Sequence, residues 1–173
     1  DQDLQQITHP QKRREWLSSR LLVKSLTELL GLAYHGTYKD AHGKLFLQDH
    51  EAEISITHSL DYVAGIIHQT KEIGIDIEAI HPKLQRTARK YLENAELNHA
   101  QDDLQILAMY WCAKEAMYKL HGKNKVSFKD NIRIAPFHRD QNQLSGQIIG
   151  IPQLISSTLL VRWFDAYCLV VAI

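Results

Sequence analysis

The chain has 173 residues, of which 45% are hydrophobic and 23% are charged. These proportions are typical of a folded globular protein, and the length suits one domain or two small halves that share a core. Lysine plus arginine equals aspartate plus glutamate, at 20 each, so the net charge provides no bulk attraction to nucleic acid or to a membrane surface. We expect neither as a partner, and no apolar run approaches the ~20 residues that span a bilayer.

The first half of the chain has the pattern of one helix followed by strands. An apolar stripe at helical spacing predicts a helix over residues 11–30, with Gly31 as its C-cap. The segment 40–43 has the composition of a hairpin turn. Alternating or apolar runs predict three strands after this turn, over residues 54–57, 62–68 and 72–80.

The second half repeats this order with more helix. Apolar periodicity predicts helices over residues 87–98 and 104–121, and closing strands follow over residues 128–134, 144–149, 159–164 and 167–173. The order predicts an α+β fold with mainly antiparallel pairing. Because each half offers a helix and about three strands, we expect two similar lobes, 1–72 and 73–173, related by an internal pseudo-two-fold axis. They would share one core and have a ligand cleft between them.

Two cysteines, Cys112 and Cys168, lie far apart in the sequence. Because we find no signal peptide, we expect free buried thiols and a cytoplasmic location. The chain begins at Asp1 and not at a methionine, so we expect that a few native N-terminal residues are missing.

Two acids lie two residues apart in the segment 74–78, Gly-Ile-Asp-Ile-Glu. A strand turns every second side chain to the same side, so Asp76 and Glu78 share a face. Like carboxylates on a buried face repel each other and need a cation. Taken alone, the pair is more simply interpreted as two surface acids at a solvated strand end.

Glu115 and Lys119 lie four residues apart in the strongest predicted helix. An exposed pair at this spacing is worth only about 0.3–0.5 kcal/mol and has no further role. The apolar neighbours Trp111, Cys112 and Ala116 favour instead a half-buried helix whose polar groups face a cleft. If this helix meets the strand with the acid pair, three carboxylates and an ammonium converge, which suits a magnesium ion and a phosphate ester.

A hydroxyl-rich strand end and two basic positions complete the candidate site. Thr57, His58 and Ser59 together offer several hydrogen-bond donors to phosphate oxygens, although a plain strand end or a core histidine has the same composition. The pair Arg13-Arg14 and the residue Lys44 are each candidates to anchor a phosphate, or are solvated charges. The spacing of the histidines and cysteines matches no zinc motif.

Taken together, these motifs resemble those of the 4'-phosphopantetheinyl transferases, in particular the larger Sfp-like class. The segment 54–59 resembles the Ser-His-Ser element of that family, 73–78 resembles its Gly-(Ile/Val)-Asp-x-Glu element, and 111–119 resembles its Trp-x-x-Lys-Glu-Ala-x-x-Lys element. The segment 43–46 is similar to its Gly-Lys-Pro element. Leu45 stands where the family has proline, and Thr57 stands where it has serine. The resemblance runs from about Arg13 to Lys119.

The resemblance implies an activity and its partners. A 4'-phosphopantetheine group would pass from coenzyme A to a serine of an apo acyl or peptidyl carrier protein, and 3',5'-ADP would leave, as in a holo-(acyl-carrier-protein) synthase. Mg²⁺, or Mn²⁺ in its place, would be the cofactor, and the chain would act as a monomer. Which carrier protein is used cannot be read from the sequence.

The resemblance also implies roles for individual residues. Asp76, Glu78 and Glu115 would be the metal ligands, Lys119 would stabilise charge on the phosphate, and Glu115 or a metal-held water would accept the serine proton. The contacts of coenzyme A would be Arg13, Arg14, Lys44, Thr57, His58 and Ser59. Glu96 is a further acid that we expect near the site.

Two competing interpretations remain at this point. The first is another magnesium-dependent phosphotransferase, although the sequence contains no glycine-rich phosphate loop. The second is a non-catalytic module that binds coenzyme A or a carrier protein.

Overall fold

The computed structural model describes residues 2–123 and 126–173. Its helices in chain order are α1 (Gln2–Gln6), α2 (Pro10–Leu29), α3 (Lys83–Tyr91), α4 (Asn94–Ala100) and α5 (Leu104–His121). Its strands are β1 (Thr37–Lys39), β2 (Leu45–Leu47), β3 (Glu53–Ser59), β4 (Tyr62–His68), β5 (Gly74–Ala79), β6 (Ile132–Ile134), β7 (Gln143–Ile148), β8 (Ile155–Phe164) and β9 (Tyr167–Ala172).

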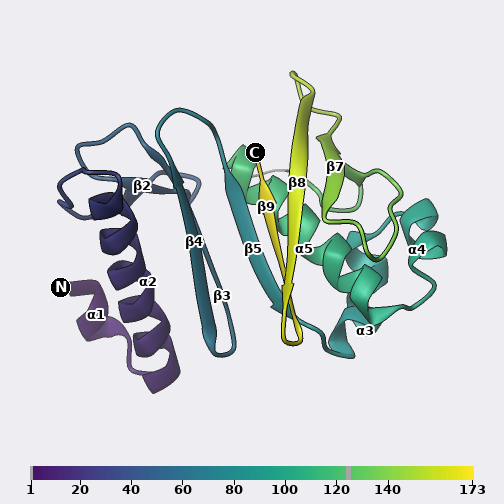
Figure 1. Ribbon diagram of the computed structural model, residues 1–173, viewed down its shortest axis with the longest axis horizontal. Coiled ribbons are helices and arrows are strands. Elements are labelled where there is room, and N and C mark those ends of the chain that lie inside the picture. Colours follow the sequence, from purple (N-terminus) through teal and green to yellow (C-terminus); the bar gives the residue numbers. More distant parts are fainter. Residues whose placement is uncertain (1, 124–125) are drawn as a thin grey trace.

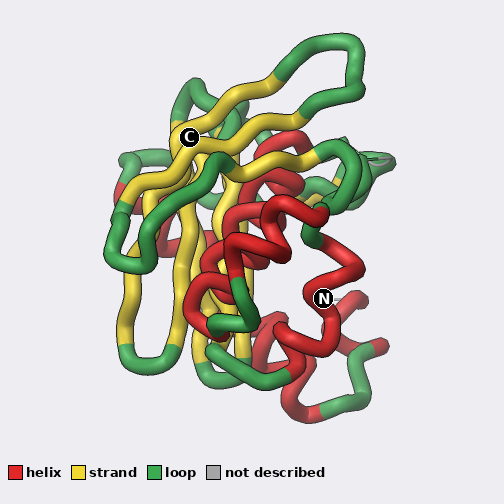
Figure 2. Tube along the Cα trace, turned by 90° about the vertical axis from the view of Figure 1, so that its right-hand side faces the viewer, coloured by secondary structure: helices red, strands yellow, loops and turns green. Residues whose placement is uncertain are grey.

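The strands form two sheets, both antiparallel throughout. The first has the order β1-β2-β3-β4 and the second the order β5-β9-β8-β7-β6. Figure 1 shows α2 beside the first sheet and α5 behind the second, and in the side view of Figure 2 most helices lie on one side of the strands. The predicted α+β fold with antiparallel pairing is therefore confirmed. The two lobes differ in strand number and helix content, so their pseudo-two-fold symmetry stays a prediction.

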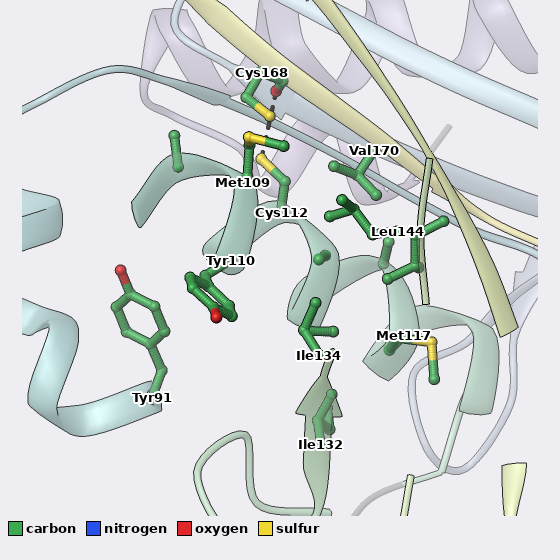
Figure 3. Close-up of a cluster of buried hydrophobic side chains, with 14 of the residues drawn as sticks. Tyr91, Met109, Tyr110, Cys112, Met117, Ile132, Ile134, Leu144, Cys168 and Val170 are labelled. Carbon is green, nitrogen blue, oxygen red and sulfur yellow. Dashed lines mark hydrogen bonds between the residues drawn. The ribbon is translucent and has the colours of Figure 1, made fainter. Parts of the chain in front are cut away.

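The larger core surrounds α5. Figure 3 shows Met109, Cys112 and Met117 of α5 among buried side chains of the second sheet. The Cys112 thiol donates a hydrogen bond to the Cys168 carbonyl oxygen (3.4 Å), and both thiols are free and buried, as expected. Because α5 is buried around most of its circumference, it packs on several sides against neighbouring elements.

Gly74 lets α5 approach β5 more closely than any side chain allows. A Cβ atom at this position would lie 1.9 Å from the Ala116 carbonyl oxygen. The contact joins Gly74 of β5 to Ala116 of α5. Asp76 follows two residues later on the strand, and Lys119 follows three residues later on the helix. The glycine of the Gly-Ile-Asp-Ile-Glu motif therefore allows β5 and α5, which carry the candidate site, to pack closely.

Most predicted elements are present, with differences in the extent of several; β8, for example, begins at Ile155 and not at Leu159. The helix predicted over 87–98 is interrupted, because Leu92 is fully buried in extended conformation and Glu93 and Glu96 form a capping box that starts α4. The strand predicted over 128–134 begins only at Ile132, after a turn. The short helix α1 was not predicted.

The apolar stripe of α2 is only partly turned inward. Leu17, Leu21 and Leu29 are 41%, 65% and 82% exposed, whereas Ser19, Val23 and Thr27 are buried. Leu22 and Leu26 pack over Gly65 of β4, where the missing side chain makes room for them. The helix agrees with the sequence prediction to within one residue at each end, but its C-cap is Leu30, and Gly31 follows the cap with a positive φ.

In the described ranges 2–123 and 126–173, no helix is both long and apolar enough to cross a membrane.

Candidate functional site

A cavity of about 1080 Å³ lies where the two sheets, α2 and α5 meet. Its walls come from α2, the β1–β2 hairpin, β3, β5 and α5. Asp76, Glu78, Glu115 and Lys119 all line it. The helix and the strand that carry the acid motifs therefore do meet, and the four polar side chains face one space.

Asp76 is the most constrained of these side chains and is only 5% exposed. Its Oδ1 atom accepts hydrogen bonds from the Thr57 hydroxyl (2.9 Å) and from the Lys119 ammonium (2.8 Å). Its Oδ2 atom is buried and has no hydrogen-bond partner within the described part of the chain. A buried carboxylate oxygen without a partner is costly, so this atom calls for a ligand.

Glu78 and Glu115 bring two more carboxyl groups to the cavity. Glu78 Oε1 accepts from the Ser59 hydroxyl (3.2 Å) and from the Ala79 N–H group (3.1 Å). Burial, and then the charges of Asp76 and Glu78, raise the pKa of Glu115 to about 7, although Lys119 opposes the shift. The cavity therefore disfavours a third negative charge unless a cation is present.

Lys119 is fixed at the edge of β5. Its ammonium donates to the Ile75 carbonyl oxygen (3.0 Å) and to Asp76 (2.8 Å), and the side chain is still 27% exposed. The ammonium is thus held by the same strand that carries two of the acids, and it remains accessible from the cavity.

The first lobe contributes basic groups that are already paired with acids. Lys44 pairs with Glu53 (2.8 Å), and its stem packs over Gly122. His58 pairs with Glu15 of α2 (3.2 Å). The Glu15 carboxylate also accepts from Lys12, and these contacts lower the pKa of Glu15, chiefly through Lys12. Both Lys44 and His58 line the cavity, and their contact with coenzyme A stays a prediction.

Arg13 and Arg14 are not among the residues that line the cavity. Arg13 donates to the carbonyl oxygens of Leu4 and Ile7 and so holds the turn between α1 and α2, and Arg14 is exposed. The face of α2 that lines the cavity carries five other residues, namely Lys12, Glu15, Trp16, Ser19 and Arg20. Their spacing of three and four residues is the signal that could have identified them.

Trp16 and Arg20 lie together on this face. The Arg20 guanidinium stands 4.8 Å from the centroid of the Trp16 ring. The pair adds an aromatic surface and a cation to the cavity, and sequence reasoning missed both residues.

Thr57 and Ser59 lie on the side of β3 that faces β5, and their hydroxyls bond to the carboxylates of Asp76 and Glu78. Thr57 lines the cavity as well. Their expected role as phosphate donors stays a prediction, because in this structure the hydroxyl protons point to acids.

Glu96 lies elsewhere than expected. Its carboxylate pairs with Lys114 (2.7 Å), and the two side chains are 4% and 0% exposed. Lys114 also donates to the carbonyl oxygens of Phe128 and Ile132, so it connects α5 to α4, to the turn before β6 and to the start of β6 itself. Glu96 therefore belongs to a buried ion pair in the core and not to the cavity.

The three carboxyl groups that line the cavity are candidate ligands of a divalent cation. In the parts of the chain that the structure describes, no group of three or more His, Cys, Asp or Glu side chains stands in an arrangement that would already hold a metal. The chemistry of the donors nevertheless fits a hard cation, because three carboxyl groups face one cavity and Asp76 Oδ2 lacks a partner. We therefore treat the cation as compatible with these residues.

Comparison with known proteins decides the family. The family model described as ACPS, 4'-phosphopantetheinyl transferase superfamily, matches residues 72–172, more than half of the chain. The chain belongs to this superfamily. The match covers β5 and α5, which carry the acids and Lys119 in this member of the 4'-phosphopantetheinyl transferase superfamily.

Individual relatives support the same family. The chain is 29% identical over 119 residues to the 4'-phosphopantetheinyl transferase AcpT of Escherichia coli (strain K12). This match covers 64% of the chain and 59% of the relative. The AcpT protein of Salmonella typhi is also 29% identical over 119 residues, covering 64% of the chain and 60% of the relative. The matched region thus spans about three fifths of the length of these curated relatives.

Proposed function

We propose that this protein transfers the 4'-phosphopantetheine group of coenzyme A to a serine of an apo acyl or peptidyl carrier protein. The observation that carries the proposal is the convergence of Asp76, Glu78, Glu115 and Lys119 in one cavity of about 1080 Å³. Membership of the superfamily and the names of the two relatives support it. Small-molecule and cofactor sites usually have volumes of about 300–1,000 Å³, so this cavity is large enough for such a ligand.

The chemistry is a phosphoryl transfer. A bond forms between the serine oxygen and the β-phosphorus of coenzyme A, and the bond from that phosphorus to the bridging oxygen breaks. The bridging oxygen leaves with the electron pair as part of 3',5'-ADP, and the serine proton passes to a base. Such a reaction depends mainly on positioning and on neutralising charge.

Asp76, Glu78 and Glu115 would hold Mg²⁺, or Mn²⁺ in its place. When bound, the ion would neutralise charge on the pyrophosphate and polarise it towards attack. Lys119 would stabilise the charge that develops on the phosphate. Glu115, or a water held by the ion, is our candidate to accept the serine proton.

The anionic end of coenzyme A would be held from the first lobe. Lys44 and His58 line the cavity and keep the roles that the sequence suggested for them. We replace Arg13 and Arg14 in this role by Lys12 and Arg20, because these two basic residues of α2 line the cavity.

We further infer that the protein is a member of the larger Sfp-like class that acts as a cytoplasmic monomer with the two lobes as its halves. The two sheets, formed by residues before and after 69–73, and the cavity between them support this inference.

Incubation with coenzyme A, Mg²⁺ and a panel of apo carrier proteins tests the proposal directly. We expect one carrier to gain the mass of a phosphopantetheine group, measured by intact-protein mass spectrometry, and we expect chelation of the metal to abolish the gain. Asp76→Ala is expected to fold and to lose the transfer activity. Binding of coenzyme A without modification of any carrier would favour a non-catalytic module, and binding of ATP in preference to coenzyme A would contradict the proposal.

A further inference from the structure

Strands β3 and β5 belong to different sheets but are joined by side-chain hydroxyls. The Ile75 N–H group donates to Ser55 Oγ (3.1 Å), and the Ile77 N–H group donates to Thr57 Oγ1 (3.4 Å). The partners advance together along both strands, so β3 and β5 run parallel at this junction. The other edge of β5 is paired with β9. The hydroxyls of β3 therefore satisfy the edge of β5 that its own sheet leaves open.

The same hydroxyls point their protons at the two acids of β5. Thr57 Oγ1 donates to Asp76 Oδ1 (2.9 Å), and Ser59 Oγ donates to Glu78 Oε1 (3.2 Å). Thr57, Ser59 and Asp76 are 6%, 8% and 5% exposed, so water competes little for these bonds. An ionised carboxylate can only accept hydrogen bonds, so the single proton of the Thr57 hydroxyl points to Asp76.

This arrangement decides which oxygen of Asp76 remains available. Thr57 and Lys119 both bond to Oδ1, and this leaves Oδ2 buried and without a partner in the described ranges. The β-branched side chain of Thr57 restricts its χ1 angle, which holds the hydroxyl in place. Removal of the hydroxyl would free the carboxylate to turn about its terminal torsion, which is broad and roughly two-fold.

We propose that Thr57 and Ser59 are positioning residues for the carboxylates of β5, with Thr57 orienting Asp76 so that Oδ2 meets a divalent cation. This inference rests on the proposed function. It assigns the hydroxyls a different task from direct contact with a phosphate of the substrate, and it explains why threonine suits position 57 as well as serine.

The test compares three variants by Mn²⁺ binding in the presence of coenzyme A, measured by calorimetry, alongside carrier modification. Thr57→Val keeps the shape and removes the hydroxyl, whereas Thr57→Ser keeps the hydroxyl. Thr27→Val is the matched control, because Thr27 is a fully buried threonine of α2 whose hydroxyl, among the residues that the structure describes, bonds only to the Val23 carbonyl oxygen.

We expect Thr57→Val to weaken Mn²⁺ binding about 10–100-fold, the usual effect of removing a group that orients a metal ligand. The Mg²⁺ concentration for half-maximal transfer should rise in parallel, and KM for coenzyme A at saturating Mg²⁺ should stay within about threefold of the parent. Thr57→Ser should restore most of the affinity. Thr27→Val should lose thermal stability without any change in Mn²⁺ affinity.

Parent-like Mn²⁺ affinity in Thr57→Val would overturn the inference and leave the proposed function intact, and so would a raised KM for coenzyme A at every metal concentration. A parent protein that modifies no carrier overturns the proposed function itself. If Thr57→Val does not fold, Ser59→Ala applies the same comparison through Glu78. Unchanged Mn²⁺ affinity in that variant would then count against the inference.

Discussion

Two lysines of α5, five residues apart, illustrate how burial separates a structural ion pair from a functional one. Lys114 is fully buried, and its ammonium donates to three oxygens, one each from Glu96, Phe128 and Ile132. Lys119 is 27% exposed, and within the described residues it bonds to two oxygens of β5.

The acids that accompany the two lysines differ in the same way. Both oxygens of Glu96 are satisfied, by Lys114 and by the N–H groups of Glu93 and Ile134. Asp76 keeps one buried oxygen without a partner. A pair with every donor and acceptor satisfied inside the core holds elements together. A pair with an unsatisfied oxygen that faces a cavity has remaining capacity for a ligand.

Replacing Lys114 by methionine should have the largest effect on stability. The Glu96 charge would be buried without compensation, which costs about 3–5 kcal/mol of unfolding free energy. Urea denaturation measures the loss. The double variant Lys114→Met/Glu96→Leu should recover a large part of it, because both charges are then absent. A loss below about 1 kcal/mol in the single variant would show that the ion pair of Lys114 and Glu96 does not stabilise the core.

Lys119→Met should affect activity more than stability, unlike Lys114→Met. We expect a smaller loss of stability than in Lys114→Met, because the Lys119 side chain is partly solvated and Asp76 keeps the Thr57 hydroxyl as a donor. We expect kcat for carrier modification to fall about 10²–10³-fold, as when one group that stabilises developing charge is removed. Steady-state kinetics should show the loss in kcat, and the affinity for coenzyme A should change little. A variant altered only in KM would contradict the transition-state role.

Glu115→Gln should change how the free energy of unfolding depends on pH. The folded-state pKa of about 7 lies above the ordinary 4.5, so the folded state favours the neutral acid. The resulting stability is fully present below pH 4.5 and is lost as the pH rises to about 7. In metal-free buffer, Glu115→Gln should therefore gain about 3 kcal/mol relative to the parent between these two pH values.

Urea denaturation of both proteins at several pH values measures this difference, and groups shared by the two proteins cancel in the comparison. An unchanged difference across the window would show that Glu115 is not held in an apolar, acidic environment.

The smallest expected effect concerns the two faces of α2. Arg20→Ala should raise KM for coenzyme A about fivefold, which corresponds to about 1 kcal/mol for one partly solvated ionic contact. Arg14→Ala is the matched control on the exposed face and should stay within about twofold. Equal effects of the two variants would show that the face lining the cavity carries no special role in binding.

Local pattern was sufficient for much of the fold. The apolar periodicity of residues 104–121 and the apolar run of 62–68 predicted α5 and β4 with the bounds that the structure has, because both patterns are properties of adjacent residues. The interruption at Leu92 was not predictable in this way. It depends on the burial of Leu92 and on Glu96, which has a partner in β6.

The sequence by itself determined which chemical groups this protein has and on which elements they lie: acids at alternate positions of β5, and Glu115 and Lys119 one turn apart on α5. Only the tertiary structure decided which of them share a cavity, because that depends on the contact of α5 with Gly74 and on the junction of β3 with β5. The tertiary structure likewise placed Lys114 and Glu96 in the core, and Arg20, not Arg13, at the cavity. The charge of a side chain does not show whether it lies in the core or at the cavity. Its burial and its hydrogen-bond partners decide this, and they depend on residues far apart in the chain.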